Sequence, residues 1–207
     1  MLADLSITQF MEKTASDSPF PGGGSVAALS AATSASLVEM VANLTIGKKG
    51  CEEVEPVMKK IARDAETYRN KLIKDIDRDS DAYSQVMNAF QLPKSTDQEK
   101  NARTAAIQEA LKHACLVPLE VAEDAFEVIE LAGEVVAKGN KNAVTDGLVG
   151  AMMARTAVLS ALYNVKINLA SIKDKEFADD IADKVKHMET EVGNTEKKIL
   201  SAGSFDF

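Results

Sequence analysis

The sequence predicts an all-α protein, built as a bundle of about six helices, several of them long and roughly antiparallel. Alanine, methionine, glutamate and lysine are plentiful, whereas aromatic residues make up 5% and tryptophan is absent, which favours helices over strands. Apolar residues recur in steps of three and four, and no segment alternates with a period of two. No repeat and no linker divides the chain, so we expect a single domain over residues 1–207.

The first two helices are separated by a proline- and glycine-rich turn. A capping box at residues 6–9 begins a short helix, and the prolines of residues 18–21 forbid its continuation. Three glycines at residues 22–24 then precede a helix of small residues, predicted from Ser25 to Ile46. Its only charge is Glu39, but its many Ser, Thr, Ala and Asn residues indicate a buried helix rather than a membrane span.

The third helix, predicted from Glu52 to Phe90, carries one acid on its apolar stripe. The stripe advances in steps of three and four, except for a single seven-residue step from Ile76 to Tyr83 that contains Asp79. At about 100° per residue, Asp79 lies on the apolar face, whereas its neighbours Asp77 and Asp81 project away from it. Pro93 closes this helix.

Three further helices complete the predicted bundle. A capping box at residues 96–99 starts a helix that reaches Lys138, with a kink or break expected near Val117 because Pro118 follows. The next helix, Ala143 to Ser171, is apolar nearly all round, which is typical of the middle of a bundle or of a subunit interface. Asp174 can cap the last helix.

Composition excludes several classes of function. The formal net charge of −8 argues against nonspecific nucleic-acid binding, which needs a basic face. The two histidines, His113 and His187, stand alone without metal-ligand spacing, so no metal site is predicted. The N-terminus lacks the basic and apolar segments of a signal peptide, and we expect a cytoplasmic protein without membrane contact.

Asp79 is the strongest candidate for chemistry. A lone carboxylate on an apolar face pays a desolvation penalty, so it needs partners or a task. Two interpretations are balanced at this point: a satisfied buried acid that holds a neighbouring helix, or a general acid or base with a raised pKa.

Other polar features are weaker. The glycines before Ser25 allow close approach of a ligand, and the free amides at a helix start attract anions, but a flexible turn that ends in a Ser cap is the favoured explanation. Lys48 can hold a carboxylate-bearing ligand or simply complement the helix dipole, and Asp146 also fits a dipole role in the first turn of its helix. Asn164 and Asn168 share a face, so we expect them to satisfy each other or a facing helix.

These features, in this order, resemble one family. The similarity runs through Pro21 to Ala28, Met40 to Lys48, Asp77 to Tyr83, the Gly139-Asn140 turn with Asp146, and Asn164 to Leu169. The chain is similar to the cyclodeaminase domain of formiminotransferase-cyclodeaminase, a family that includes stand-alone bacterial methenyltetrahydrofolate cyclohydrolases. We identify no formiminotransferase domain, so a bifunctional, channelled arrangement is not expected.

The resemblance implies an all-α homodimer with a tetrahydrofolate substrate and no cofactor beyond that folate. It also implies that Asp79 is catalytic. The first hypothesis is formimidoyltetrahydrofolate cyclodeaminase, in which N10 attacks the formimino carbon and ammonia leaves; the alternative is methenyltetrahydrofolate cyclohydrolase, in which water attacks the methenyl bridge. A noncatalytic helical dimerisation module is the alternative of a different class. The residues expected to bind substrate are Gly22, Gly23, Gly24, Ser25, Asn43, Lys48, Asp77, Asn140 and Asp146.

Overall fold

The computed structural model describes residues 1–203 and confirms the all-α prediction. Six α-helices and two short 3₁₀ helices make up this part of the chain, and it contains no strand. In order they are η1 (Leu2–Asp4), α1 (Ile7–Thr14), α2 (Gly23–Asn43), α3 (Glu55–Phe90), α4 (Asp97–Lys138), η2 (Lys141–Ala143), α5 (Val144–Leu169) and α6 (Lys175–Ala202).

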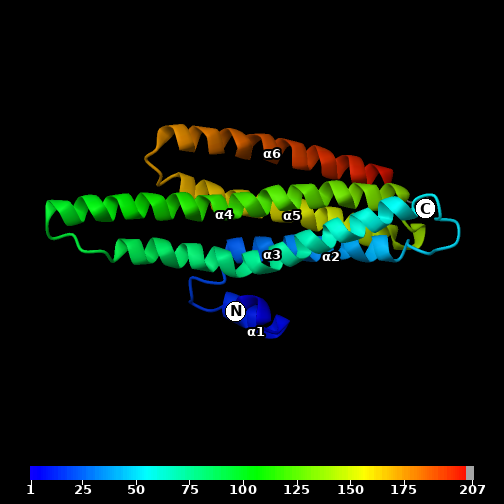
Figure 1. Cartoon of the computed structure of the whole chain (residues 1–207), viewed down its shortest axis with the longest axis horizontal. Helices are drawn as coiled ribbons and strands as arrows, with labels where there is room; N and C mark the ends of the chain where they lie inside the picture. Colours follow the sequence, from blue (N-terminus) through cyan, green and yellow to red (C-terminus); the bar gives the residue numbers. More distant parts are fainter. Residues whose placement is uncertain (204–207) are drawn as a thin grey trace.

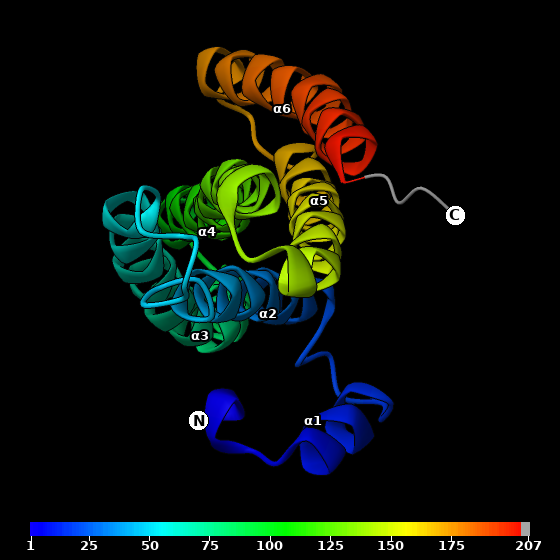
Figure 2. The ribbon, with the colours of Figure 1, turned by 90° about the vertical axis from the view of Figure 1, so that its right-hand side faces the viewer.

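The four helices α2 to α5 form the centre of the bundle, and α6 packs on the outside against α4 and α5 (Figures 1 and 2). Short connections turn each helix back along its predecessor, which gives the antiparallel arrangement expected for such loops. The short helix α1 lies apart from this bundle, on the side of α2 and α3, as both views show.

Small residues let α2 lie close to its neighbours. Five alanines between positions 27 and 35 are buried, and the Ser34 hydroxyl donates to the Gly150 carbonyl of α5 at 2.7 Å. Such a contact between a side chain and a facing helical backbone needs a small residue on both sides, which explains the composition of α2 and the N-terminal half of α5. Both helices are long and apolar enough to cross a membrane by length and composition, yet about half of each apolar window is buried within the bundle.

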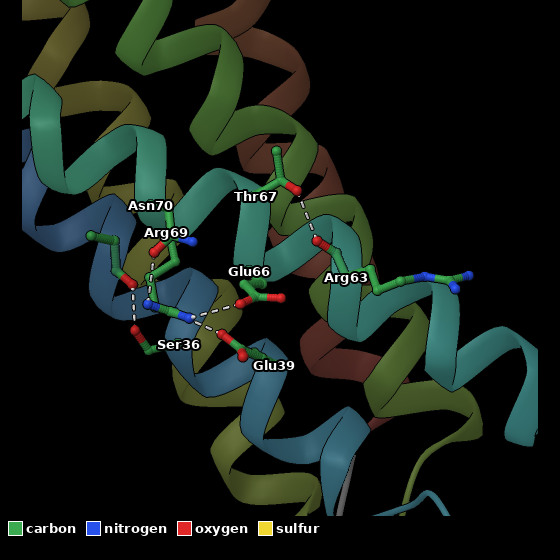
Figure 3. A network of polar contacts seen from close by, with 8 residues as sticks. Ser36, Glu39, Arg63, Glu66, Thr67, Arg69 and Asn70 are labelled. Atoms are coloured by element: carbon green, nitrogen blue, oxygen red, sulfur yellow. Dashed lines mark hydrogen bonds and ion pairs between the residues drawn. The ribbon is translucent and has the colours of Figure 1, made fainter.

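A polar contact joins α2 to α3 on their outer side. Glu39, the only charged residue of α2, accepts from Arg69 Nε of α3 at 2.7 Å, and Glu66 lies at the edge of the same cluster (Figure 3). The ion pair satisfies the one charge on α2.

Helix starts follow the predicted caps. Ser6 and Thr96 each accept from the third residue of their helices in a complete capping box, and Asp174 accepts from the Phe177 amide. The second helix begins at Gly23 rather than Ser25, because Gly22 takes the cap position and the glycines form the first turn.

The expected kink or break near Val117 is not a break: α4 is one continuous helix from Asp97 to Lys138 with Pro118 inside it. Proline lacks the amide that would bond the carbonyl of Ala114, four residues earlier. The Asn168 side chain of α5 donates to that carbonyl at 2.8 Å. A donor from the facing helix thus replaces the missing one, and the helix continues.

Candidate active site

Asp79 lies at a cavity of about 310 Å³ formed between the start of α2, the middle of α3 and α4, and the end of α5. This volume falls at the low end of the range for small-molecule sites. Three lining groups share the cavity. They are the glycines 22–24, the α3 residues Asp79, Ser80, Ala82, Tyr83 and Val86, and the facing residues Ala114, Asn164, Ile167 and Asn168; Pro19 and Phe20 complete the rim.

The first turn of α2 is built around the carboxylate of Asp79. A Cβ added at Gly24 would stand 1.9 Å from Asp79 Oδ1, so only glycine permits this approach. The Ser25 hydroxyl lies 2.8 Å from the Ile76 carbonyl and 3.3 Å from Asp79 Oδ2, and the Ser25 amide also bonds Asp79. Gly24, Ser25 and Asp79, all predicted site residues, therefore meet at one place.

Burial raises the pKa of Asp79 above the usual aspartate range, and the hydrogen bonds from the Ser25 side chain and amide oppose that shift without cancelling it. Within residues 1–203, no cation contributes to its pKa. A carboxyl in this state exchanges a proton more readily near neutral pH than an exposed aspartate does, which is the property of a general acid or base.

The neighbouring arginine is directed to a different partner. Arg78 Nη1 lies 2.7 Å from the carboxylate of Asp75, which is 1% exposed, and Arg78 Nη2 lies 2.9 Å from Glu120 of α4. This network ties α3 to α4 and keeps the guanidinium away from Asp79. The apolar periodicity of α3 did not identify Asp75 as buried, because its burial depends on the partner from α4.

Asp77 was expected to bind substrate, but in the structure it contacts the N-terminal segment. Its carboxylate accepts the backbone amides of Leu2 at 2.6 Å and Ala3 at 3.2 Å. Asp77 projects off the apolar stripe, as the helix geometry predicted, and therefore meets the N-terminal segment instead of the cavity. It does not line the cavity.

Four other expected site residues lie at the opposite end of α2. Asn43 is its last residue, Lys48 and Asn140 are hydrogen-bonded to each other in the loops beyond, and Asp146 stands in the first turn of α5. A helix of 21 residues is about 30 Å long. Within one copy of the chain, these residues and Asp79 cannot contact the same part of a small molecule.

Asn140 has a structural task in this position. Its backbone amide donates to Thr45 Oγ1 at 2.9 Å, and its side chain donates to the Leu44 carbonyl at 3.2 Å. The contacts join the loop after α2 to the loop after α4. Lys48 adds its ammonium group to the same junction.

The cavity also contains residues that sequence reasoning did not assign to it. Asn164 and Asn168 are tied to each other and to α4, as predicted: Asn168 donates to the carbonyls of Asn164 and Ala114, and Asn164 donates to Ser160. Within residues 1–203 neither side-chain oxygen accepts a hydrogen bond, and both residues line the cavity. The two oxygens are therefore free to accept from a ligand.

Phe20 and Tyr83 are the two aromatic additions. Tyr83 follows Asp79 by one helical turn, so the periodicity that placed Asp79 on the inner face carried the signal for Tyr83 as well. Phe20 stands in an irregular segment, where no periodicity indicates which way a side chain points. In the part of the chain that the structure describes, no group of His, Cys, Asp or Glu residues could hold a metal ion.

Comparison with known proteins gives a consistent result. Residues 6–187 match the family model described as formiminotransferase-cyclodeaminase. The chain is 42% identical over 199 residues to the methenyltetrahydrofolate cyclohydrolase of Methylorubrum extorquens, covering 96% of both proteins. It is 34% identical over 178 residues to the formimidoyltransferase-cyclodeaminase of Rattus norvegicus, of which it spans 33%.

A solved structure is similar over nearly the whole chain. The crystal structure of formiminotetrahydrofolate cyclodeaminase from Thermotoga maritima superposes with a TM-score of 0.88 at 30% sequence identity, covering 98% of this chain and 97% of that one.

Proposed function

Because the chain belongs to the formiminotransferase-cyclodeaminase family, we propose that it is a methenyltetrahydrofolate cyclohydrolase, which opens the N5–C–N10 bridge of 5,10-methenyltetrahydrofolate with water. It is an enzyme, since its relatives are named for either cyclohydrolase or cyclodeaminase activity. The noncatalytic dimerisation module considered from the sequence is therefore set aside.

The comparisons favour the reaction that the sequence placed second. The relative that bears the cyclohydrolase name is 42% identical and has the same extent as this chain. The bifunctional relatives, which bear the cyclodeaminase name, are similar over only a third of their length. The cyclohydrolase reading therefore takes precedence over the cyclodeaminase reading.

Asp79 supports the chemistry that this reaction needs. The methenyl bridge carries a positive charge shared between N5 and N10, and its carbon is the electrophile. A water molecule that attacks this carbon must lose a proton, and ionised Asp79 would accept it. When the resulting carbinolamine collapses, N5 leaves with the proton from Asp79, and the proton of the new hydroxyl goes to solvent. A positioned proton acceptor of this kind contributes about 10²–10⁴-fold to the rate.

The charge of the site fits this substrate class. Asp79 is an acid without a bound cation, in a cavity otherwise lined by apolar, amide and hydroxyl groups. A cationic bridge placed beside it would supply the missing counter-charge in a setting where water is partly excluded. The amide of Ser25, at the start of α2, stabilises the ionised carboxylate, so the glycine turn serves Asp79 itself rather than an anionic substrate tail.

The experiment is a pair of assays on the purified protein and on Asp79→Asn. Loss of methenyl absorbance measures hydrolysis, and ammonia release from 5-formiminotetrahydrofolate measures the cyclodeaminase reaction. We expect hydrolysis by the wild type, a loss of two or more orders of magnitude in Asp79→Asn, and near-normal rates in the control Asp81→Asn, whose side chain is exposed. A wild-type protein that is inactive on both folates would refute the assignment.

Cyclodeaminase activity is the second candidate, supported by the similarity to the Thermotoga maritima enzyme. Both reactions form or break bonds at the same bridge carbon, so the same cavity and the same acid would serve either one. In that reaction Asp79 would move a proton between N10 and the departing amine. Ammonia released at a rate above methenyl hydrolysis would reverse the order of the two candidates.

We further propose that the protein acts as a homodimer through the outer faces of α2 and α5. Large apolar side chains are exposed on both, namely Val26 and Met40 on α2, Leu44 at its C-cap, and Val149, Met152, Tyr163 and Ile167 on α5. On α2 they are arranged symmetrically about Thr33: Val26 and Met40 lie seven positions either side of it. Such a stripe is complementary to itself when two copies pack antiparallel across a two-fold axis.

This arrangement would also bring the two separated groups of predicted residues together. Gly22 and Leu44 lie eleven positions either side of Thr33, so the glycine turn of one copy would face the end of α2 in the other. The partner's Lys48, close beyond that end, could then approach the anionic tail of a folate bound at Asp79. A cytoplasmic location, and the absence of any cofactor beyond the folate, accompany this proposal.

A further inference from the structure

The N-terminal arm, residues 1–22, lies outside the bundle but contacts it at three places. At its beginning, Leu2 is buried and its backbone amide is held by Asp77. At its end, Phe20 meets Tyr83 of α3, with ring centroids 6.5 Å apart and the rings tilted by 57°. Between these contacts the backbone of α1 stands apart from α2 and α3 (Figure 2), but its Phe10 side chain is buried in the hydrophobic core.

The second contact places the arm in the cavity wall. Pro19 and Phe20 line the cavity beside the glycine turn, and Tyr83 lines it one helical turn from Asp79. Tyr83 is 41% exposed and Phe20 is half-buried, so part of the surface of each ring remains accessible. Lys13 Nζ stands 5.7 Å from the centre of the Phe20 ring, so this ring already has a cation over one face.

Aromatic faces beside a carboxylate suit a flat cation. The negative face of an aromatic ring attracts positive charge, and the attraction grows when water is excluded. A bridged folate presents such a group, because the methenyl positive charge is delocalised over a planar five-membered ring. Among residues 1–203, the bundle supplies one aromatic side chain to this cavity, Tyr83, and the arm supplies the other, Phe20.

We propose that Phe20 is a substrate-binding residue that forms, with Tyr83, an aromatic wall for the cationic bridge, and that Asp77 is a positioning residue that anchors the arm carrying Phe20. The inference rests on the proposed folate substrate and extends it to residues outside the bundle. Asp77 contributes without touching the substrate, because it fixes the beginning of the same segment whose end forms the wall.

The first measurement compares Phe20→Leu with Phe20→Tyr in the methenyl assay. Leucine keeps apolar bulk but removes the aromatic face, so KM is expected to rise about tenfold while kcat stays within about twofold. Tyrosine keeps the face and is expected to restore KM to near the wild-type value. Phe90→Leu is the matched control, because Phe90 is a 46% exposed phenylalanine at the C-terminal end of α3 and does not line the cavity.

A comparison of a charged with an uncharged folate distinguishes a cation–π interaction with Phe20 from a simple loss of contact area in Phe20→Leu. Binding of 5-formyltetrahydrofolate, whose bridge is open and uncharged, is measured by calorimetry on the same variants. Phe20→Leu is expected to weaken this binding less than it raises KM for the cationic substrate. An equal loss for both ligands, or an unchanged KM, would overturn the role assigned to Phe20.

The role of Asp77 is tested by non-additivity. Asp77→Asn weakens the two bonds to the arm and is expected to raise KM without lowering kcat, whereas Asp81→Asn leaves both unchanged. Because Asp77 acts through Phe20, the double variant should show the KM of Phe20→Leu alone. Independent, multiplied effects would overturn the anchoring role.

Failure of the proposed function gives a different pattern. If the wild type turns over neither folate, calorimetry can be run with both 5,10-methenyl- and 5-formyltetrahydrofolate, and a larger loss of binding for the charged ligand in Phe20→Leu still decides the role of Phe20. Because Phe20 is not part of the buried core, we expect its variants to fold. Circular dichroism of each variant checks that the helical bundle is intact.

Discussion

Gly24 and Asp79 are in such close contact that no side chain could stand between them: a Cβ on Gly24 would lie 1.9 Å from Asp79 Oδ1 and 2.7 Å from Oδ2. The first turn of α2 and the catalytic candidate on α3 are therefore fitted to each other. The sequence contains three consecutive glycines, at residues 22–24. The structure shows that Gly24 is the one whose missing side chain makes room for the Asp79 carboxylate.

Gly24→Ala should displace the Asp79 carboxylate and lower kcat about 10²-fold, because a shift of about 1 Å at a reacting group has an effect of that size. The bundle itself should remain folded, as judged by circular dichroism and thermal unfolding. Gly193→Ala in α6 is the control, since nothing lies within 4 Å of its added Cβ and alanine favours the helix. Full activity of Gly24→Ala would mean that Asp79 does not act from its present position.

Removing the Ser25 hydroxyl should move the pH profile. That hydroxyl lowers the pKa of Asp79, against the larger upward effect of burial. Since a base works only when ionised, kcat/KM should fall as the pH drops through the pKa of Asp79. In Ser25→Ala this acidic limb should lie at higher pH, whereas Ser36→Ala, which removes an exposed hydroxyl of the same helix, should leave it in place. A limb that stays fixed in Ser25→Ala would exclude Asp79 as the titrating base.

Asp79→Asn should be at least as stable as the wild type at neutral pH. The folded-state pKa of Asp79 is raised, so its contribution is most favourable below the unfolded-state pKa, about 3.9, and is lost as the pH rises through the folded value. Asparagine cannot ionise and avoids that loss. Thermal unfolding at pH 7 and at pH 3 should show the advantage only at pH 7; a clear destabilisation at pH 7 would instead indicate a structural acid.

Thr33→Glu should separate the proposed dimer. At the centre of an antiparallel α2 pair, each new carboxylate would face its copy across the two-fold axis, and the like charges would repel in partly dehydrated surroundings. Light scattering after size exclusion should give the dimer mass for the wild type and 22.2 kDa for the variant. Thr67→Glu, an exposed threonine on α3, should remain dimeric. A monomeric wild type would contradict the interface.

The amide of Asn168 should matter only while Pro118 is present. In the wild type, Asn168→Ala leaves the Ala114 carbonyl without a donor, which should reduce the free energy of unfolding by about 1–3 kcal/mol. In a Pro118→Ala background, the new backbone amide can bond that carbonyl, so the same substitution should cost less. Chemical denaturation of the four proteins measures the coupling, and strictly additive costs would argue against it.

Helix faces were predictable, and helix neighbours were not. A stripe with steps of three and four located the inner face of α3 and placed Asp79 on it, because that period is a property of the helix alone. The partners of that face depend on which helix packs there and at which level. Asn164 and Asn168, far along the chain, reach the cavity for this reason, and no local signal assigned them to it.

The length of the predicted second helix already argued against a single pocket within one copy of the chain, although the family resemblance suggested one. Ser25 and Lys48 both belong to segments similar to one family, which suggested one pocket. A straight helix between them separates its ends by about 30 Å, however, so one copy cannot join them. Phe20 was beyond prediction for another reason: it lies between two prolines in an irregular segment, where the backbone path is set by tertiary contacts.

Pro118, Ala114 and Asn168 together have a consequence for how this chain can change over evolution. The proline removes a donor from α4, and the asparagine on α5 provides a replacement. The stability cost of losing Asn168 therefore depends on whether position 118 is proline. Among homologous proteins, substitutions at positions 118 and 168 are therefore expected to occur in a correlated way. In a homologue with a residue other than proline at position 118, the backbone amide can bond the carbonyl at 114, so position 168 can vary. Because Asn168 lines the cavity, that variation would also change the cavity wall.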